Sequence, residues 1–353
     1  MTDTDAVILV GGLGTRLRPL TLSAPKPMLP TAGVPFLTHL VTRLRDAGVR
    51  HIVLGTSYRA EVFEAHFGDG ADLGVELEYV VETEALGTGG GIRNVADTLR
   101  GDTVLVLNGD NLVGVDLEAL VAEHRERDAD VTLTLTRVDD PRAFGCVPTD
   151  ADNRVLAFLE KDPNPVTDQI NAGLYVFRRS IVDTIPTGRP VSVEKETFPG
   201  LLAAGAAVFG HVHGGYWRDF GTPADFVSGS CDLVLGRAPS PAVASPGESL
   251  VLAGAEVAGT VGGGTTIGRD AVVAAGAEVD ASVVFDGARI GAGAVVRRSV
   301  IGAGAVVGDG TVVEDAVIGD RARVGAGNEL RHGVRVWPDA SLADGTVRFS
   351  SDC

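Results

Sequence analysis

Hydrophobic and polar positions follow two different rhythms along the 353 residues of the chain. From residue 6 to about residue 235, short runs rich in β-branched residues alternate with longer segments in which apolar residues recur every three or four positions. Such alternation predicts an α/β domain with a mainly parallel sheet and helices on both of its faces. We expect strands at 6–10, 51–55, 75–81, 103–107, 131–138, 155–159 and 172–177, and helices at 35–47, 60–67, 90–99, 117–127 and 223–235.

A six-residue rhythm begins after a stretch rich in proline, alanine and serine. Glycine, alanine and aspartate fill the positions between its apolar residues, which resembles the hexapeptide left-handed β-helix, a triangular solenoid. We therefore expect a domain at 1–235, a stiff linker at 236–247 and a parallel β-helix at 248–353 that serves for structure and for homo-oligomerisation. The period is clearest in Val306, Val312, Ile318, Val324, Leu330, Val336 and Leu342, and earlier turns show it in Ile267, Val273, Val279 and Phe285.

The charge balance and the cysteines narrow the partners and the compartment. Lys and Arg total 30 against 47 Asp and Glu, so the formal net charge of −17 argues against nucleic acid as a partner. The acidic start of the chain is unlike a secretory signal, and the longest uncharged stretch, 197–217, is interrupted by Pro199 and several glycines, so we expect no membrane span. Three widely spaced cysteines (Cys146, Cys231 and Cys353) predict neither a disulfide framework nor a metal pair, which favours the reducing cytoplasm.

Lysine is almost absent from this chain, since the 30 basic residues comprise 27 arginines and three lysines. The three lysines, Lys26, Lys161 and Lys195, each lie in a compact motif with proline or glutamate neighbours. Chance survival of three lysines is the plain alternative. Their context makes them candidates for functional ammonium groups.

A glycine-rich loop follows the first predicted strand, in the sequence Leu9-Val10-Gly11-Gly12-Leu13-Gly14-Thr15-Arg16-Leu17-Arg18-Pro19. Leu17 stands where a dinucleotide fingerprint would need its third glycine, and no lysine follows a glycine as in a P-loop. The loop therefore favours backbone contacts to a polyphosphate, with Arg16 and Lys26 neutralising its charge. A plain turn after a strand is the alternative for this loop taken alone.

Together with Pro25-Lys26-Pro27, this loop resembles the signature of the sugar-1-phosphate nucleotidyltransferases. The resemblance covers both expected domains and is closest to the mannose-1-phosphate guanylyltransferases that carry a C-terminal hexapeptide solenoid. It implies a Rossmann-like catalytic domain of the GT-A type. Further motifs stand in family order: Leu86-Gly87-Thr88-Gly89-Gly90, Asn108-Gly109-Asp110, Phe158-Leu159-Glu160-Lys161, Asn171-Ala172-Gly173, Val193-Glu194-Lys195-Glu196-Thr197-Phe198-Pro199 and Trp217-Arg218-Asp219-Phe220-Gly221.

The resemblance implies a reaction in which a sugar 1-phosphate attacks the α-phosphorus of a nucleoside triphosphate and pyrophosphate leaves. The nucleophile is already an anion, so catalysis consists of positioning and charge neutralisation. Arg16, Lys26 and Asp110 match the catalytic residues, and Asp110 and Asp219 match the carboxylates that bind Mg²⁺. A turn or helix-capping role is the alternative for either aspartate alone.

The resemblance also implies two sets of binding residues. The nucleotide set comprises Leu9, Gly11, Gly12, Gly14, Thr15, Arg16, Glu82, Gly87, Thr88 and Asn108. The sugar-phosphate set comprises Gly145, Glu160, Lys161, Asn171 and Lys195, of which Lys195 has the least defined role.

The choice of base depends on Glu82. Thymidylyl- and uridylyltransferases resemble this chain but have glutamine at this position, whose amide both donates and accepts. A carboxylate only accepts, and guanine offers it two adjacent donors, N1-H and the N2 amine. We therefore expect GTP as the nucleotide, with Glu84 as a competitor for the role and a solvated glutamate as the plain alternative.

The expected activity is transfer of GMP from GTP to mannose 1-phosphate, giving GDP-mannose and pyrophosphate. Transfer to a heptose 1-phosphate, or thymidylyl or uridylyl transfer to glucose 1-phosphate, is the alternative within the family. A hexapeptide acyltransferase would need a catalytic histidine in the solenoid, where His332 is the one histidine and lysine is absent. A catalytically inactive regulatory subunit is disfavoured because Arg16, Lys26, Asp110, Lys161 and Asp219 are all retained.

Overall fold

The computed structural model describes residues 1, 3–57 and 59–348, which form two compact units. The first unit comprises Met1–Gly12 and Leu40–Trp217, and the second comprises Leu13–His39 and the chain from Arg218 onward. The glycine-rich loop is thus divided, because the chain leaves the first unit at residue 12 and returns to it at residue 40.

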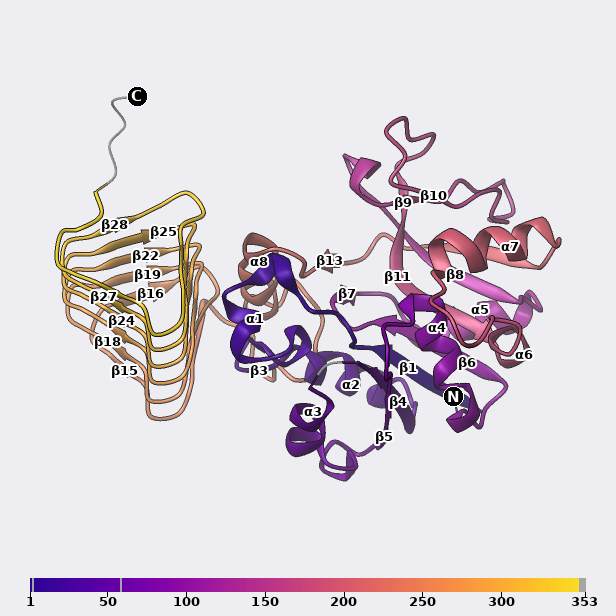
Figure 1. Ribbon diagram of the computed structural model, residues 1–353, viewed down its shortest axis with the longest axis horizontal. Coiled ribbons are helices and arrows are strands. Elements are labelled where there is room, and N and C mark those ends of the chain that lie inside the picture. The colour runs from indigo at the N-terminus through magenta and orange to yellow at the C-terminus, as the bar shows by residue number, and fades with distance from the viewer. Residues whose placement is uncertain (2, 58, 349–353) are drawn as a thin grey trace. The chain divides into compact units, whose positions relative to one another are not determined.

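A nine-stranded sheet forms the centre of the first unit (Figure 1). Its order is β10-β9-β11-β6-β1-β4-β5, with β8 pairing to β11 and β12 to β8. Parallel pairing joins β1 to β4, β1 to β6, β4 to β5 and β8 to β12, whereas β11 runs antiparallel to its neighbours β6, β8 and β9. The strands are β1 (Thr4–Leu9), β4 (His51–Thr56), β5 (Glu76–Val81), β6 (Thr103–Asn108), β8 (Val131–Arg137), β9 (Gly145–Cys146), β10 (Leu159–Glu160), β11 (Gln169–Arg178) and β12 (Val208–Val212). The Rossmann-like sheet expected from the sequence is confirmed.

Helices cover this sheet because its strands are apolar on both faces: Val7 and Val53 are fully buried on one face, and Ile8 and Leu54 on the other. Most helices begin and end close to the predicted positions, but the helix predicted at 90–99 begins at Gly87 and ends at Asn94, and a 3-10 turn follows it at Ala96–Thr98. Asp116 caps α5 by accepting from the backbone N-H groups of residues 118 and 119. They are α2 (Phe36–Asp46), α3 (Ala60–Phe67), α4 (Gly87–Asn94), α5 (Leu117–Glu126), α6 (Arg179–Val182) and α7 (Phe198–Ala203), and α2 begins in the second unit. None of the helices in the described ranges is long and apolar enough to cross a membrane.

The strand predicted at 155–159 is wrong for most of its length. Only Leu159 enters a strand, β10, while Val155 makes an isolated bridge to Thr149. Val155 and Phe158 are nevertheless buried in the core of the unit. The apolar run therefore reflects packing of a loop against the core, which alternation alone does not distinguish from a strand.

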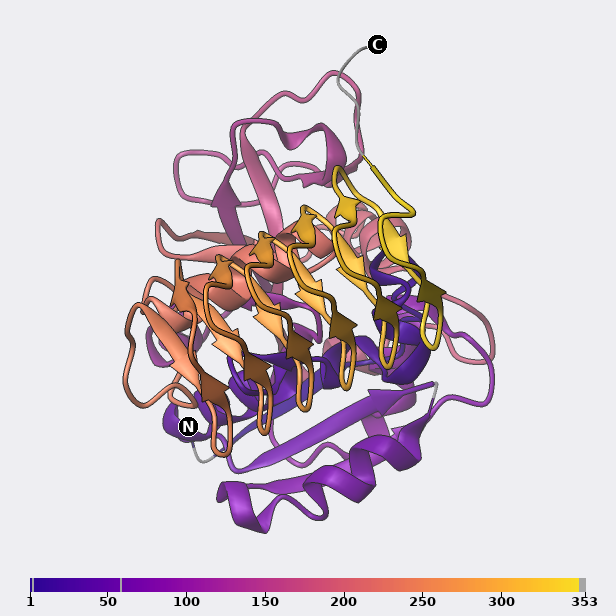
Figure 2. The same ribbon diagram turned by 90° about the vertical axis from the view of Figure 1, so that its left-hand side faces the viewer.

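The described part of the second unit contains a small hairpin, the helices α1 and α8, the start of α2 and a parallel β-helix. Residues after the glycine-rich loop form α1 (Leu20–Ser23), β2 (Pro30–Thr31) and β3 (Val34–Pro35), and β13 (Trp217–Asp219) leads into α8 (Pro223–Val234). The solenoid strands fall into three parallel sheets, and Figure 2 shows their coils stacked in register.

We name the three solenoid sheets A, B and C. Sheet A is β14 (Ser249–Val251), β17 (Thr265–Ile267), β20 (Val283–Val284), β23 (Val300–Ile301), β26 (Val317–Ile318) and β29 (Arg335–Val336). Sheet B is β15 (Glu256–Val257), β18 (Val272–Val273), β21 (Arg289–Ile290), β24 (Val306–Val307), β27 (Arg323–Val324) and β30 (Ser341–Leu342). Sheet C is β16 (Thr260–Gly262), β19 (Glu278–Asp280), β22 (Val295–Arg297), β25 (Val312–Glu314) and β28 (Glu329–Leu330).

The register inside the solenoid differs from strict hexapeptides. Strand partners in successive central coils are 17 residues apart, as in Val295 with Val312, so one of the three sides has five residues. The core side chains are consequently Val307 and Val313, whereas Val306 and Val312, which belong to the six-residue period in the sequence, are half-buried outside this core. The cause is a tight corner at residues 281, 298 and 315, all with positive φ, after which Ser282 and Ser299 form a ladder of backbone N-H to hydroxyl bonds.

The outer face of sheet A is covered within its own unit. Thr266, Val283, Val300 and Val317 point away from the solenoid core, yet each is 3% exposed or less. Helix α8 packs on β17 and β20, and Phe226 of α8 meets Phe285 edge-on at a centroid distance of 6.4 Å. Helix α8 of the same chain thus covers part of one aliphatic face of the predicted β-helix.

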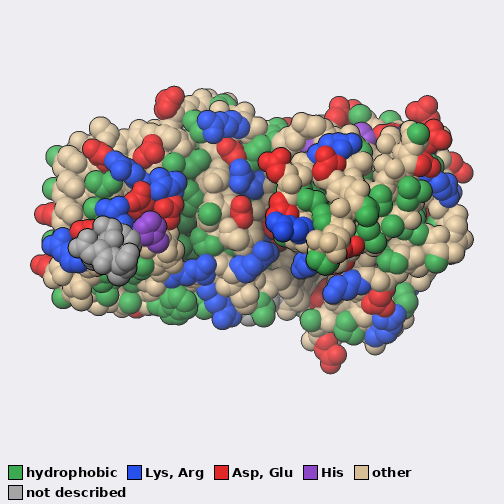
Figure 3. Space-filling view, turned by 90° about the horizontal axis from the view of Figure 1, so that it is seen from above, with side chains coloured by type: hydrophobic (Ala, Val, Ile, Leu, Met, Phe, Trp, Pro, Cys, Tyr) green, Lys and Arg blue, Asp and Glu red, His purple; other side chains and the backbone are tan. Residues whose placement is uncertain are grey.

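Charged side chains of both signs lie side by side on the solenoid surface, which is at the left of Figure 3. Arg298 donates to both Glu314 and Asp315, and Arg331 donates to Glu314. Exposed pairs of this kind contribute little stability individually. They neutralise part of the acidic surface locally.

Candidate active site

The second unit carries a cationic pair around the carboxylate of Asp219. The Arg16 Nη2 atom lies 3.8 Å from Asp219 Oδ2, and Lys26 Nζ lies 3.7 Å from Asp219 Oδ1. Lys26 is the more buried of the two, with 10% of its side chain exposed against 65% for Arg16. The fold therefore brings together three residues that were predicted from the sequence, although Arg16 and Lys26 each lie more than 190 positions before Asp219. The exposed guanidinium and the sheltered ammonium outnumber the single carboxylate between them, so the cluster keeps a net positive charge. This charge suits a polyphosphate.

The loop that carries Arg16 is tightly built around Gly14 and Thr15. Gly14 has φ of 57°, and a Cβ there would lie 2.9 Å from the Thr21 methyl group and 3.2 Å from Lys26 Cβ. The Thr21 hydroxyl donates to the Gly14 carbonyl at 2.9 Å, and Leu17 anchors the loop with a fully buried side chain. Only glycine fits position 14, since it tolerates both the left-handed backbone and the close approach.

Gly221 is a second glycine whose backbone lies close to the cationic pair. A Cβ there would lie 2.8 Å from Arg16 Nη2 and 2.9 Å from Asp219 Oδ2. The glycine of the Trp-Arg-Asp-Phe-Gly motif therefore leaves room for Arg16 to reach Asp219.

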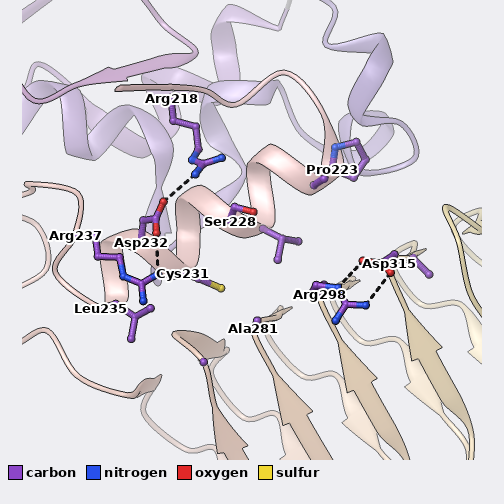
Figure 4. Close-up of a pocket in the computed structure, with 14 residues that line it drawn as sticks. Arg218, Pro223, Ser228, Cys231, Asp232, Leu235, Arg237, Ala281, Arg298 and Asp315 are labelled. Carbon is purple, nitrogen blue, oxygen red and sulfur yellow. Dashed lines mark hydrogen bonds and ion pairs between the residues drawn. The ribbon is translucent and has the colours of Figure 1, made fainter. Parts of the chain in front are cut away.

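Strand alternation sends Arg218 to the opposite side of β13 from Asp219. There Arg218 donates to Asp232 of α8 at 3.1 Å and approaches Asp225 at 3.7 Å. It lines a cavity of about 370 Å³ between α8 and the solenoid, together with Arg237, Arg298 and others (Figure 4). Asp232 pairs with Arg218 and Arg237, and Asp315 pairs with Arg298, so the lining keeps one net positive charge. The Arg218 to Asp232 pair ties the strand of Asp219 to α8.

In the first unit, Asp110 follows β6 in a tight turn. Gly109 donates its N-H to the Leu9 carbonyl at 2.9 Å, and a Cβ on Gly109 would lie 2.6 Å from that oxygen. Asn108 pairs with Leu9 in the parallel register of β6 and β1. Half-buried Asp110 therefore lies at the carboxyl ends of the central strands, where ligands of parallel sheets bind.

The part of the glycine-rich loop that belongs to the first unit, up to Gly12, is held by Ser57, a residue that the sequence analysis did not predict. The Ser57 hydroxyl, just after β4, donates to the Gly11 carbonyl at 2.5 Å. A Cβ on Gly11 would lie 2.7 Å from the same hydroxyl oxygen, so glycine is required by contact here. For Gly12 no atom lies within 4 Å of such a Cβ.

Glu82 lies directly after β5 and faces α4. Its carboxylate accepts from the N-H of Leu86 at 3.3 Å, and a Cβ on Gly91 would lie 2.7 Å from Glu82 Oε1. Burial raises the pKa of Glu82, although the Leu86 bond opposes this shift. Glu84, its competitor, is exposed. The structure therefore gives Glu82 the more defined position of the two.

The Gly87-Thr88 turn is bound to the segment around Glu194. The Thr88 hydroxyl donates to Glu194 Oε2 at 2.8 Å and accepts from the Val193 N-H at 3.0 Å. Ser192 donates to the same Glu194 oxygen at 2.7 Å. The hydroxyl of Thr88 is thus engaged within the protein, and Glu194 organises the turn.

Glu160 pairs with Gly145 on the β9–β10 ladder, and Lys161 follows it directly in the chain. A Cβ on Gly145 would lie 2.9 Å from Glu160 Oε2 and 2.7 Å from the Phe158 ring. Burial raises the pKa of Glu160, and Lys161 and Lys195 oppose this shift while Glu194 adds to it. Lys161 is 69% exposed, with Nζ 3.8 Å from Glu160. The two exposed lysines and two glutamates thus belong to one electrostatic neighbourhood.

A buried tyrosine links two of the predicted asparagines. Asn171 donates to the Tyr175 hydroxyl at 2.7 Å, and Asn108 also hydrogen-bonds to it. Complete burial raises the pKa of Tyr175 far above its ordinary value. Trp217 donates from its indole N-H to the Ala172 carbonyl at 3.0 Å and meets Phe144 edge-on. Sequence reasoning missed Ser57, Tyr175 and Glu194, because they act on other site residues and their types carry no chemical signal by themselves.

One further cluster is suited by composition to a cation. His51, Glu76 and Glu78 have ligand atoms within 4.8 Å of one another. However, Arg100 pairs with both glutamates, and His51 bonds to Asp5 at 2.9 Å. The cluster lies where β4 and β5 begin, the opposite edge of the sheet from Asp110. It is an ion-pair network that joins strand starts.

Comparison with known proteins gives a consistent picture. A nucleotidyl transferase profile matches residues 5–234, and a profile described as the GMPPB C-terminal domain matches residues 247–347. The chain is 62% identical over 354 aligned residues, 99% of both chains, to the mannose-1-phosphate guanylyltransferase of Mycobacterium tuberculosis. It is 42% identical over 231 residues, 65% of this chain and 62% of the relative, to the catalytic subunit beta of that enzyme in Drosophila pseudoobscura. The crystal structure of HddC from Yersinia pseudotuberculosis matches with a TM-score of 0.58 and 30% identity, over 65% of this chain and 99% of that one.

Proposed function

The chain belongs to the nucleotidyl transferase family, and from that premise we propose that it transfers GMP from GTP to mannose 1-phosphate, forming GDP-mannose and pyrophosphate. A relative that is 62% identical along 99% of both chains supports the choice of sugar and nucleotide. The observation that carries the proposal is the flanking of Asp219 by Arg16 and Lys26 in the second unit.

The reaction needs little covalent help from the protein. A phosphate oxygen of mannose 1-phosphate forms a bond to the α-phosphorus of GTP, and the bond from that phosphorus to the bridging oxygen of pyrophosphate breaks. The attacking oxygen is anionic, so no group has to remove a proton. Arg16 neutralises charge on the β- and γ-phosphates, while the sheltered Lys26 holds the α-phosphate and the attacking phosphate together.

We assign Asp110 of the first unit and Asp219 of the second unit to the binding of Mg²⁺. Both are carboxylates, which Mg²⁺ prefers, and both are half-buried at the end of a strand or in its last position. When bound, the ion would neutralise triphosphate charge and orient the phosphates. Asp219 in addition keeps Arg16 and Lys26 within 4 Å of itself, which assembles the cationic pair.

The sugar phosphate is assigned to the neighbourhood of Glu160. Lys161 and Lys195 bind its phosphate, Glu160 accepts from sugar hydroxyls, and the missing side chain of Gly145 leaves space beside Glu160. Asn171 contacts the sugar with its carboxamide, which Tyr175 orients. Leu9, Gly11, Gly12, Gly14, Thr15, Gly87, Thr88 and Asn108 form the nucleotide side, and Glu82 accepts from N1-H and N2 of guanine.

Pyrophosphate release from the purified protein tests this function. Four nucleoside triphosphates are each paired with mannose, glucose and heptose 1-phosphates, with Mg²⁺ present. We expect the highest kcat/KM for GTP with mannose 1-phosphate, a loss of several orders of magnitude in Asp110→Asn, and reversible inactivation by excess EDTA. Preference for another pair would replace the proposed substrates, and full activity in EDTA would remove the metal assignment.

A further inference from the structure

One arginine of the solenoid is bonded directly to the backbone of the glycine-rich loop. Arg335 of β29 donates from Nη1 to the Arg16 carbonyl at 3.0 Å and to the Arg18 carbonyl at 2.6 Å. The partners are 319 and 317 positions apart in the sequence, and all belong to the second unit. Charge-assisted bonds to two carbonyls are stronger and more directional than neutral ones.

The position of Arg335 in the solenoid is also distinctive. It continues the outward column of sheet A, in which Thr266, Val283, Val300 and Val317 are buried under the rest of the unit. At the last coil the column changes from apolar residues to an exposed arginine. Apolar residues are favoured where this face is packed against other apolar groups. An arginine is favoured where carbonyl oxygens lie opposite the sheet, because its guanidinium donates hydrogen bonds to them.

The bonded carbonyls belong to the residues on whose geometry the cationic pair depends. The side chain of Arg16 is 65% exposed and touches Asp219 only at 3.8 Å, so packing does little to fix its direction. Its backbone is held by Leu17 on one side and by Arg335 on the other. A change in the backbone at residues 16–18 would redirect the guanidinium.

We propose that Arg335 is a positioning residue, which fixes the backbone of the Arg16 loop from the last solenoid coil and so presents Arg16 to the triphosphate. The proposal rests on the proposed function for its kinetic consequence. Its structural content, that Arg335 restrains residues 16–18, stands independently. The solenoid thereby contributes to the active site through an arginine that touches no reacting atom.

Kinetics of three variants form the first test. In Arg335→Ala we expect kcat/KM for GTP to fall about tenfold or more, in line with the cost of a small misplacement of a catalytic group. The KM for mannose 1-phosphate should stay unchanged, because Lys161 and Glu160 belong to the first unit. Arg335→Lys should recover part of the loss, since an ammonium also donates to carbonyls. Arg323→Ala, an exposed arginine on sheet B, is the matched control and should retain wild-type values.

Limited proteolysis forms the second test and needs no activity. Trypsin cleaves after Arg16, whereas proline at position 19 blocks cleavage after Arg18. Mass spectrometry should detect the fragment that begins at Leu17 several times faster in Arg335→Ala than in the wild type or Arg323→Ala, with equal melting temperatures. Equal cleavage rates together with equal kcat/KM would overturn the proposal. A wild-type protein that releases no pyrophosphate would instead contradict the proposed function and leave the proteolysis result to decide on Arg335.

Discussion

Glu82 is the residue to which we assign the choice of base, because its carboxylate can only accept hydrogen bonds. In Glu82→Gln we expect kcat/KM for GTP to fall by about 10- to 100-fold, because one accepted bond from guanine is lost and a donor faces a donor; buried mismatches of this kind cost roughly 1 to 3 kcal/mol. Activity with thymidine or uridine triphosphate should rise, since the amide can donate to a pyrimidine carbonyl. The measurement is pyrophosphate release with each triphosphate.

Glu84→Gln is the matched control for this substitution, because Glu84 is exposed two positions away. It should leave nucleotide preference unchanged. If the preference followed residue 84 and ignored residue 82, the assignment of the base to Glu82 would be wrong.

His39 makes stability depend on pH. Its Nε2 atom lies 2.9 Å from the Thr31 carbonyl and must donate to it, so Nδ1 accepts from Ser240 at 2.6 Å in the neutral ring. Burial lowers the pKa of His39 from 6.5 to about 4. The pKa of His39 is lower in the folded state than in the unfolded state. The contribution of neutral His39 to the free energy of unfolding is therefore complete above pH 6.5 and is lost as the pH falls from 6.5 towards 4. One pKa unit is worth about 1.4 kcal/mol, so the loss amounts to roughly 3 kcal/mol at most.

Urea unfolding at pH 7.5 and pH 5 measures this effect. His39→Gln should be less stable at pH 7.5 but should lose less stability on acidification than the wild type. His124, whose pKa burial also lowers to about 4, adds a similar slope that remains in the variant. His66→Gln removes an exposed histidine and should leave the wild-type slope; an equal slope in His39→Gln would contradict the prediction.

At the scale of single residues, the sequence predicts those that carry charge in a recognisable motif. Arg16, Lys26 and Asp219, which the sequence analysis named from their motifs, lie together, with the charged groups of Arg16 and Lys26 each within 4 Å of the Asp219 carboxylate. Tyr175 and Glu194 were not predicted, because their importance depends on which side chains they contact in the folded chain. Thr88 illustrates the same limit, since its hydroxyl bonds to Glu194.

At the scale of the elements, the composition of the solenoid coils can be predicted from the sequence, but the register of their strands cannot. The sequence predicts the repeat correctly, but the apolar pairs at 306–307 and 312–313 fit either of two registers, and only the five-residue side of the 17-residue coil decides between them. The apolar run at 155–159 fails for a related reason, because burial of a loop gives the same pattern as a strand. Local patterns thus predict which elements exist better than how neighbouring coils align.

Two aspartate substitutions test the solenoid register. Val307→Asp places a carboxylate in the core and should destabilise the protein by about 3 kcal/mol or more, whereas Val306→Asp, which points outward, should cost well under 1 kcal/mol. Thermal or urea unfolding of both variants measures the difference. Equal losses, or a larger loss for Val306→Asp, would restore the strict six-residue register.

For the whole molecule, the consequential feature is that residues 13–39 pack with α8 and the solenoid as one unit. The sequence predicts separable domains at 1–235 and 248–353, with every catalytic residue in the first. Deletion of residues 240–353 should expose the apolar cover of sheet A on α8, lower the melting temperature and remove Arg335. We therefore expect kcat to fall at least tenfold, in line with the cost of misplacing a catalytic group, while mannose 1-phosphate still binds to the first unit.

Calorimetry with mannose 1-phosphate, pyrophosphate release and light scattering measure these outcomes on the same truncated protein. Fewer subunits per particle than in the full-length protein, after the mass of the deleted segment is taken into account, would support homo-oligomerisation through the solenoid. A truncated protein with the kcat of the full-length chain would show that the solenoid contributes nothing to the active site.

The bonds from Arg335 to the loop also set the order of events during synthesis. Arg16 leaves the ribosome early, but its partner follows 319 residues later, which corresponds to roughly 15 to 60 s at 5 to 20 residues per second. Contacts of such separation form late in folding, because the entropy of closing the intervening chain must first be overcome. Residues 16–18 therefore gain their bonds to Arg335 only after the last coil has been translated. On this proposal, a chain terminated between residues 235 and 335 contains every proposed substrate-binding residue and still lacks the bonds that restrain residues 16–18, so the full rate of turnover requires the last solenoid coil.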